Sequence, residues 1–253
     1  MLTKIKDYLR KNLIMTLFQA MTFGSILVLA IVYEQSPIQI LPMFVSLVVM
    51  FLQARVNRYA FLVGGINSCL YAVAYILRTL YSSAAYALLV SFPLQILTFI
   101  NWNKRTDKDT EERVTDLRLM SGKARLLWAV ATVVGWGALY LIFSAFGSKY
   151  MLLDNTATLL GIVTTVLCAM CYIEYAPLQL ISNVVTVILN ASMIADAPEN
   201  ITWLINSVYG TVCTAVALYV MVKNYREKQT KAEKEVTIIQ TKPINVGLNE
   251  NIE

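Results

Sequence analysis

The chain runs repeatedly for about twenty residues with no charged side chain in the middle of the run, and a helix of that length crosses roughly 30 Å of hydrocarbon. The runs are continuously apolar and do not alternate as the strands of a membrane barrel would. Apolar side chains make up 57% of the sequence and charged side chains only 15%, which suits a bilayer better than water. We therefore expect an all-α integral membrane protein with about eight transmembrane helices. The eight stretches are 13–33, 37–54, 59–77, 83–102, 126–146, 153–172, 175–194 and 202–222.

The positions of the basic residues predict how these helices are oriented. Lysine and arginine of short loops accumulate on the cytoplasmic side of a membrane. With the N-terminus inside, 19 of the 21 basic residues fall on that side, and the outer side holds only Arg78 and Lys149. We therefore expect a multi-pass protein of the cytoplasmic membrane with both termini in the cytoplasm. The net charge of +5 then reflects topology, and no nucleic-acid partner is expected.

The residue types that carry most enzyme chemistry are missing from the spans. The chain has no histidine, which excludes histidine-based catalysis and histidine metal sites. Asp154 lies near the outer end of its span and Glu174 lies in an inner turn, so no charged residue is at mid-span. Four cysteines inside apolar spans are expected to pack as small hydrophobic side chains. We expect no enzyme activity, no cofactor and no metal.

An internal repeat divides the chain. At a shift of 116 residues, RYAFLVGGIN (58–67) lies over EYAPLQLISN (174–183). Three spans precede a single linking span and three follow it, so the two triplets run in the same direction and the repeat is parallel. The expected units are a basic N-terminus with an extra helix (1–36), a first three-helix bundle (37–102), a cytoplasmic loop (103–125), a linking helix (126–146), a second three-helix bundle (153–222) and a cytoplasmic polar tail (223–253) without regular structure over much of its length.

Polar and aromatic residues recur at three- and four-residue spacing on five helices of the triplets, which places them on one face of each helix. An amide facing lipid would lack a hydrogen-bond partner, so these faces should point toward one another. Two interpretations stay open: a polar cavity for a solute, or hydrogen bonds of about 0.6 kcal/mol that join helices. We favour the cavity because several such residues occur on each helix. The candidate substrate-binding residues are Asn67, Tyr71, Gln95, Gln179, Asn183, Asn190, Asn206 and Tyr209.

The span at 83–102 carries two further signals. Pro93 should kink its helix beside the polar face, because neighbouring helices can satisfy the backbone group that proline frees. Trp102 and Lys104 are expected at the inner membrane interface, where indole and ammonium groups prefer to lie. Gln95 and Asn183 are each about two turns from the inner end, so they should flank one solute at similar depth. Because the spans lack buried carboxylates, we expect an uncoupled facilitator.

Four segments carry a further signal: NRYAFLVGGINSCLYA (57–72), FPLQILTFINW (92–102), DNTATLLGIVTTVLCAMCYIEYAPLQLISNVVTVILN (154–190) and NSVYGTV (206–212). Together they resemble the PnuC family of vitamin transporters. The resemblance covers about residues 50–220 and implies the three-plus-one-plus-three helix arrangement of the SWEET sugar transporters. It also implies facilitated diffusion of nicotinamide riboside, a small-molecule substrate that is trapped afterwards by phosphorylation in the cytoplasm.

The chain departs from this family at a place that concerns the substrate. Members for nicotinamide riboside usually carry Trp-x-x-Trp before the asparagine of the seventh span, whereas this chain has Ala176 and Gln179 there. Ring stacking would then come from Tyr71, Tyr209 or Trp102. Another nucleoside or vitamin such as thiamine or a deoxynucleoside therefore stays open. A SWEET-type sugar facilitator, a seven-helix-type signalling or scaffold protein, and a homo-oligomer also stay open.

Overall fold

The structure is a computed structural model that describes residues 13–77, 87–105, 117–144, 150–195 and 197–241. Its regular structure is helical, which confirms the prediction of an all-α protein, and the described ranges contain eight α-helices. Five helices are long and apolar enough to cross a membrane, and shorter apolar stretches lie at Ile40–Gln53 and Tyr59–Ala74. The elements are α2 (Leu13–Val32), α3 (Pro37–Gln53), α4 (Tyr59–Leu77), the π-helical turn η1 (Ala87–Ser91), α6 (Phe92–Arg105), α7 (Gly122–Ser144), α8 (Met151–Ala169), α9 (Tyr175–Ile194), the 3-10 turn η2 (Pro198–Asn200) and α10 (Ile201–Thr241).

Parts of the sequence prediction concern residues that the structure does not describe. Three predicted features lie outside the described ranges: positions 83–86 of the fourth expected span, residues 106–116 of the 103–125 loop, and the two basic residues of the outer side, Arg78 and Lys149.

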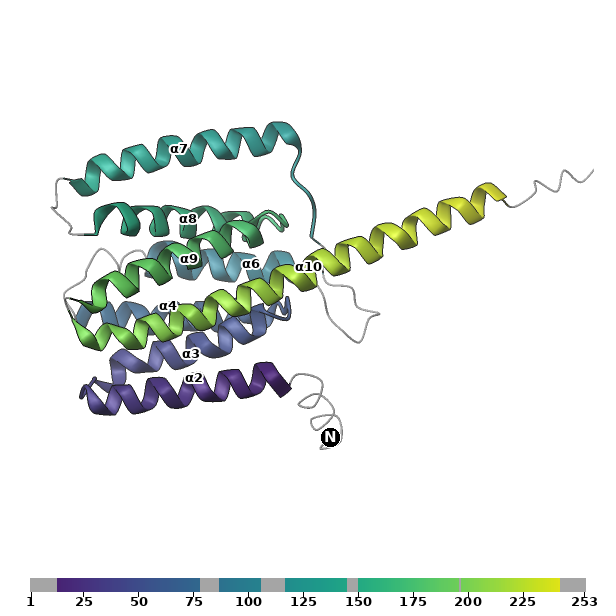
Figure 1. Ribbon diagram of the computed structural model, residues 1–253. Coiled ribbons are helices and arrows are strands. Elements are labelled where there is room, and N and C mark those ends of the chain that lie inside the picture. The colour runs from purple at the N-terminus through teal and green to yellow at the C-terminus, as the bar shows by residue number, and fades with distance from the viewer. Residues whose placement is uncertain (1–12, 78–86, 106–116, 145–149, 196, 242–253) are drawn as a thin grey trace, which may run out of the picture.

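The helices pack as two similar triplets. Within the first triplet α3 contacts α4 and α4 contacts α6, and within the second α8 contacts α9 and α9 contacts α10. The triplets meet where α6 contacts α8 and where α10 contacts α3. In Figure 1 α2 and α7 lie at opposite edges of the bundle, with α2 packed on α3 and α10 and α7 packed on α8. These contacts place six helices around the centre of the bundle, and the predicted division into units stays a prediction.

The turn from α3 to α4 and the turn from α8 to α9 are built alike. Each contains one residue in the left-handed region, Val56 with φ 54° and Cys171 with φ 60°. In each turn, the residue after the left-handed one donates its backbone N–H to a carbonyl five residues earlier in the chain. This bond caps the C-terminal end of the preceding helix. These bonds run from Asn57 N to Leu52 O (3.1 Å) and from Tyr172 N to Leu167 O (3.0 Å). The two turns therefore correspond at a shift of 115 residues.

This shift corrects the predicted register of the repeat by one residue, since the sequence match suggested 116. One residue turns a helix position by about 100°, so the correction changes which side chains are equivalent. At a shift of 115, Phe61 corresponds to Ala176 and Gly64 corresponds to Gln179. Asn67 no longer corresponds to Asn183. The two tyrosine–alanine pairs that suggested the longer shift therefore occupy different faces of α4 and α9.

Pro93 is the second residue of α6, which continues directly from the π-helical turn η1 that ends at Ser91. The kink at Pro93 stays a prediction, and the irregularity that the structure shows here is this π-helical turn. Ser91 Oγ lies 2.9 Å from Ser68 Oγ, so a hydroxyl pair joins this turn to α4. The fourth span is thus divided just before the segment that carries Gln95.

The sequence predicts Trp102 at the inner membrane interface, and in the structure its side chain is buried inside the bundle and does not face lipid. Its side chain is only 1% exposed, and its Nε1–H donates to the Cys168 carbonyl of α8 at 2.8 Å. The rings of Phe61 and Tyr175 pack against it edge-on, at centroid distances of 4.6 Å and 6.0 Å. Trp102 therefore joins α6 of the first triplet to α8 and α9 of the second, whereas Lys104 is exposed.

The polar tail is more regular than expected. Helix α10 continues through Thr241, so residues 223–241 are helical, and Figure 1 shows this part projecting beyond the bundle. The cysteine prediction is confirmed for three of the four residues, because Cys168, Cys171 and Cys213 are buried free thiols. Cys69 is half-buried and is also free.

Candidate functional site

A small cavity of about 80 Å³ lies where the two triplets meet. It is close to the end of the bundle at which α3 ends and α9 begins, called the inner end below. Side chains of α3, α4, α6, α8, α9 and α10 line it, and none of these described side chains is charged. The polar ones are Gln53, Gln95, Thr98, Thr164, Thr165, Tyr175, Gln179 and Thr214, and the others are Phe61, Cys168, Ala176, Ala217 and Met221.

Gln179 is held in the cavity wall by a chain of hydrogen bonds. Its Nε2 donates to Asn183 Oδ1 one turn further along α9 at 2.9 Å. Asn183 Nδ2 then donates to Thr214 Oγ1 at 2.8 Å and to the Gly210 carbonyl at 3.3 Å, both on α10. The predicted residue Asn183 is therefore not in the cavity wall but positions Gln179, which is.

Gln95 lies in the cavity wall on α6 and packs against Gly64 of α4. A Cβ at Gly64 would lie 3.0 Å from Gln95 Oε1, so the glycine makes room for the amide. Gln95 Oε1 is buried and has no hydrogen-bond partner among the described residues. A buried carbonyl oxygen in this state costs about 1–3 kcal/mol, which a bound solute with a suitable donor would recover.

The threonines of the cavity present oxygen acceptors. Thr98 Oγ1 donates to the Leu94 carbonyl at 2.6 Å, so its proton is used within its own helix. Thr164 and Thr165 both donate to the Gly161 carbonyl, at 3.0 Å and 2.7 Å. The lone pairs of these hydroxyls remain for a ligand. These three hydroxyls can therefore accept hydrogen bonds from a ligand, while their protons stay within their own helices.

Four other predicted residues lie further from the inner end than the cavity. Asn67 on α4 is buried, and its Oδ1 has no partner among the described residues. The ring of Tyr71 lies 6.2 Å from that of Trp203, whose carbonyl accepts from Asn190 Nδ2 at 3.3 Å. Asn206 Oδ1 accepts from Ser46 Oγ at 3.2 Å, which joins α10 to α3. Three of these four thus contact other helices, as the helix-joining interpretation expects.

Tyr209 is not brought to the cavity. Its side chain is fully buried among apolar residues of α2 and α3, and its ring lies 5.3 Å from that of Phe18. Of the eight predicted residues, Gln95 and Gln179 therefore line the cavity and Asn183 supports it.

Several cavity residues were not among the predicted site residues. Thr98 and Thr165 belong to the polar faces of their helices, and their positions could have been taken from the three- and four-residue spacing. Gln53 is the last residue of α3 and Tyr175 is the first residue of α9. A polar or aromatic side chain at a helix end does not form part of a three- and four-residue spacing, so the sequence did not single out either residue. Thr214 follows a buried cysteine, and only its bond to Asn183 identifies it.

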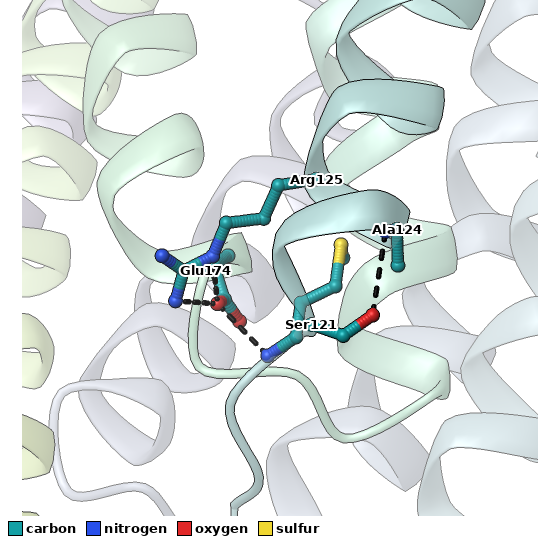
Figure 2. A network of polar contacts seen from close by, with 5 residues as sticks. Ser121, Ala124, Arg125 and Glu174 are labelled. Carbon is teal, nitrogen blue, oxygen red and sulfur yellow. Dashed lines mark hydrogen bonds and ion pairs between the residues drawn. The ribbon is translucent and has the colours of Figure 1, made fainter.

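The connection before α7 is attached to the turn before α9 at the inner end. Arg118 N donates to the Cys171 carbonyl and Ile173 N donates to the Arg118 carbonyl, both at 3.0 Å. The Arg118 guanidinium lies 4.4 Å from the centre of the Tyr172 ring. Figure 2 shows the ion pair beside it, in which Glu174 accepts from Arg125 and from the backbone N–H of Met120.

Most of the helical bundle matches a known protein family. The family model described as nicotinamide mononucleotide transporter matches residues 36–215, which is more than half of the chain. The chain belongs to this family. It is therefore a multi-pass integral membrane protein of a transporter family, as the resemblance of its motifs implied. The matched range contains every residue of the cavity except Ala217 and Met221.

A solved structure supports the fold. The chain is similar to the "Crystal structure of the Vitamin B3 transporter PnuC", with a TM-score of 0.62 and 22% sequence identity. The match covers 81% of this chain and 92% of that chain. Among curated proteins no match is found.

Ala176 and Gln179, the two positions at which the resemblance to the PnuC family implied tryptophans, both line the cavity, one turn apart on α9. At these positions this chain presents a methyl group and an amide to the cavity.

Proposed function

We propose that the chain carries nicotinamide riboside across the cytoplasmic membrane by facilitated diffusion. The observation that carries this proposal is the uncharged cavity between the triplets, lined by Gln95, Gln179 and threonine hydroxyls. Ribose hydroxyls and a carboxamide supply the donors that such a wall accepts. The rings of Phe61 and Tyr175 supply aromatic surface for the pyridinium ring.

The uncharged wall also supports a mechanism without ion coupling. Carriers driven by protons or sodium usually hold the coupling ion at a carboxylate within the membrane. The described cavity residues include no carboxylate, so the solute would move down its own gradient. Phosphorylation inside the cell would add negative charge, which an acceptor-rich wall repels, and the product would be trapped.

Transport would require the helices to move. Pockets for small ligands usually enclose about 300–1,000 Å³, which is more than the 80 Å³ of the cavity. The contacts of α6 with α8 and of α10 with α3 are the places where the two triplets could separate. In Figure 1 the start of α2 and the projecting part of α10 lie at the same end of the bundle, which supports placing both termini on one side of the membrane. The bias of basic residues toward this side supports the cytoplasm.

Uptake into proteoliposomes tests the substrate. We expect purified protein to speed entry of labelled nicotinamide riboside until the inner and outer concentrations are equal. Excess unlabelled nicotinamide riboside should compete, whereas glucose should not. Competition by glucose with no effect of the riboside would instead favour a sugar facilitator.

A second candidate is another nucleoside or a vitamin with an aminopyrimidine ring, such as thiamine. The observation that favours it is Gln179, because an amide in place of an indole offers a hydrogen bond in place of a stacking surface. Adding thiamine, cytidine and deoxynucleosides to the same competition assay separates this candidate from the first.

A further inference from the structure

We infer that Gln179 presents a fixed hydrogen-bond acceptor to the cavity, and that the site therefore selects solutes with an N–H donor at this point over those with a carboxylate or carbonyl. The N–H donor would belong to a primary amide or an exocyclic amine. This inference rests on the proposed function, because it assumes that the solute occupies the cavity between the triplets.

The orientation of the Asn183 amide follows from its partners on α10. The Gly210 carbonyl is a backbone oxygen and can only accept, so the group that faces it at 3.3 Å must be the Asn183 Nδ2. The opposite orientation would place two oxygens together. Thr214 Oγ1, 2.8 Å from the same nitrogen, can accept the second N–H. The Asn183 Oδ1 must then point the other way, toward Gln179.

The orientation of the Gln179 amide follows in turn. Asn183 Oδ1 accepts at 2.9 Å, so the Gln179 atom that faces it is Nε2. Gln179 Oε1 makes no hydrogen bond with a described residue, and it is not among the buried oxygens without a partner. Since Gln179 lines the cavity, this oxygen faces its open space. The Gly210 carbonyl on α10 thereby determines, through Asn183, that Gln179 on α9 turns its oxygen and not its nitrogen toward the cavity.

Two threonine hydroxyls in the cavity wall also act as hydrogen-bond acceptors toward a ligand. Thr164 and Thr165 use their protons on the Gly161 carbonyl and leave lone pairs for a ligand. A carboxylate brought against Gln179 Oε1 and these two hydroxyl oxygens would find no donor among the three groups, and it would lose its hydration at that point, which is costly. A carboxamide of the same shape supplies two N–H donors.

Gln95 is the natural control. It lines the same cavity on α6, but no hydrogen bond to a described residue fixes its amide, which rests against Gly64. It can therefore turn to donate or to accept. Gln95 should contribute to the affinity for many solutes, whereas Gln179 should contribute to the choice between them.

The test compares ligand pairs that differ in one group. The dissociation constants of nicotinamide riboside and nicotinic acid riboside are measured on the purified full-length protein, and so are those of cytidine and uridine. For each pair that binds, we expect the wild type to bind the N–H-bearing member about tenfold to a hundredfold more tightly than the other member. Gln179→Met should remove most of this preference. Gln95→Met should weaken both members and keep their ratio.

Asn183→Leu provides a second variant, because it leaves Gln179 in place but frees its amide to turn. We expect its preference to fall as well, while the N–H-bearing ligand still binds. The inference is overturned if the wild type binds both members equally, or if Gln179→Met and Asn183→Leu keep the wild-type ratio.

The outcome also separates this inference from the proposed function. If nicotinamide riboside binds with a ratio independent of Gln179, the proposed function stands and the inference is wrong. If only cytidine binds, and does so through Gln179, the inference stands and the proposed substrate is wrong. If no ligand of either pair binds, both are overturned.

Discussion

One oxygen of Glu174, Oε1, forms an ion pair with Arg125 Nη2 at 2.8 Å and accepts a hydrogen bond from Arg125 Nε at 3.0 Å. The same oxygen accepts from the backbone N–H of Met120 at 2.9 Å. Glu174 lies directly before α9 and Arg125 in the first turn of α7, so this contact attaches the linking helix to the second triplet (Figure 2).

The first prediction concerns this contact. Glu174→Gln removes the charge that holds Arg125, and we expect the free energy of unfolding to fall by about 1 kcal/mol, because the arginine is half-exposed and screened by solvent. Denaturant unfolding in detergent measures the change. Lys223→Gln is the control, since the Lys223–Glu227 pair is 3.9 Å long and exposed on both sides, and its loss should change the stability far less. Equal effects of the two variants would contradict the prediction.

The second prediction concerns the glycine behind Gln95. Gly64→Ala would place a methyl group 3.0 Å from Gln95 Oε1 and push the amide into the cavity. We expect slower uptake of nicotinamide riboside but no loss of thermal stability, because alanine is worth up to about 1 kcal/mol more than glycine in a helix. Gly137→Ala on α7 is the control, because a Cβ there meets nothing within 4 Å. Normal uptake by Gly64→Ala would show that Gln95 can move away freely.

The third prediction concerns energy coupling. Since the described cavity residues carry no charge, uptake should stop when the two sides are equal, whatever gradient is imposed. Labelled substrate is followed in proteoliposomes with and without proton and sodium gradients, and preloaded unlabelled substrate should accelerate its entry. Accumulation of labelled substrate above its outside concentration, without a phosphorylating enzyme in the lumen, would contradict the uniport mechanism.

The fourth prediction concerns orientation. In a version without native cysteines, Glu199→Cys should react with a membrane-impermeant thiol reagent added to intact cells, because Glu199 is exposed at the end opposite to the inner end. Lys223→Cys, exposed on α10, should react only after the membrane is opened. The reverse pattern would place both termini outside the cell.

The fifth prediction concerns Trp102. Trp102→Phe keeps the ring contacts with Phe61 and Tyr175 but loses the 2.8 Å bond to the Cys168 carbonyl. We expect a loss of about 1–3 kcal/mol in stability, measured by unfolding in detergent, because a buried carbonyl then lacks this donor. A tryptophan at the lipid interface, which the sequence suggested, would tolerate the change with little effect.

The sequence was sufficient for the helices and for part of the site. Continuous apolar runs that do not alternate identify helical spans, because only helices and closed barrels satisfy their backbone hydrogen bonds in lipid. The spacing of polar residues then indicates which face of each helix points inward. Gln95 and Gln179 were found in this way. Tyr209 was placed in the site by the same spacing, but the spacing does not say which neighbour a buried face meets, and its neighbours are α2 and α3.

The register of the repeat was beyond the sequence for a different reason. Two matching tyrosine–alanine pairs indicated a shift of 116, whereas the hydrogen bonds at Val56 and Cys171 indicate 115. The backbone hydrogen bonds on both sides of the two turns correspond at 115, so the match at 116 aligned residues that occupy different helix positions. A few chance identities cannot detect it. The continuation of α10 past Lys223 escaped prediction because a helix of charged residues shows no apolar face.

The continuous course of α10 makes it a lever. From Thr214 in the cavity wall to Thr241 the helix is unbroken, and at 1.5 Å per residue this distance is about 40 Å. A rigid rod of this length converts a tilt of a few degrees beside the cavity into a displacement of several ångströms at its far end. A fluorescent or spin label on that end would therefore follow each opening of the cavity in real time, without touching the solute path.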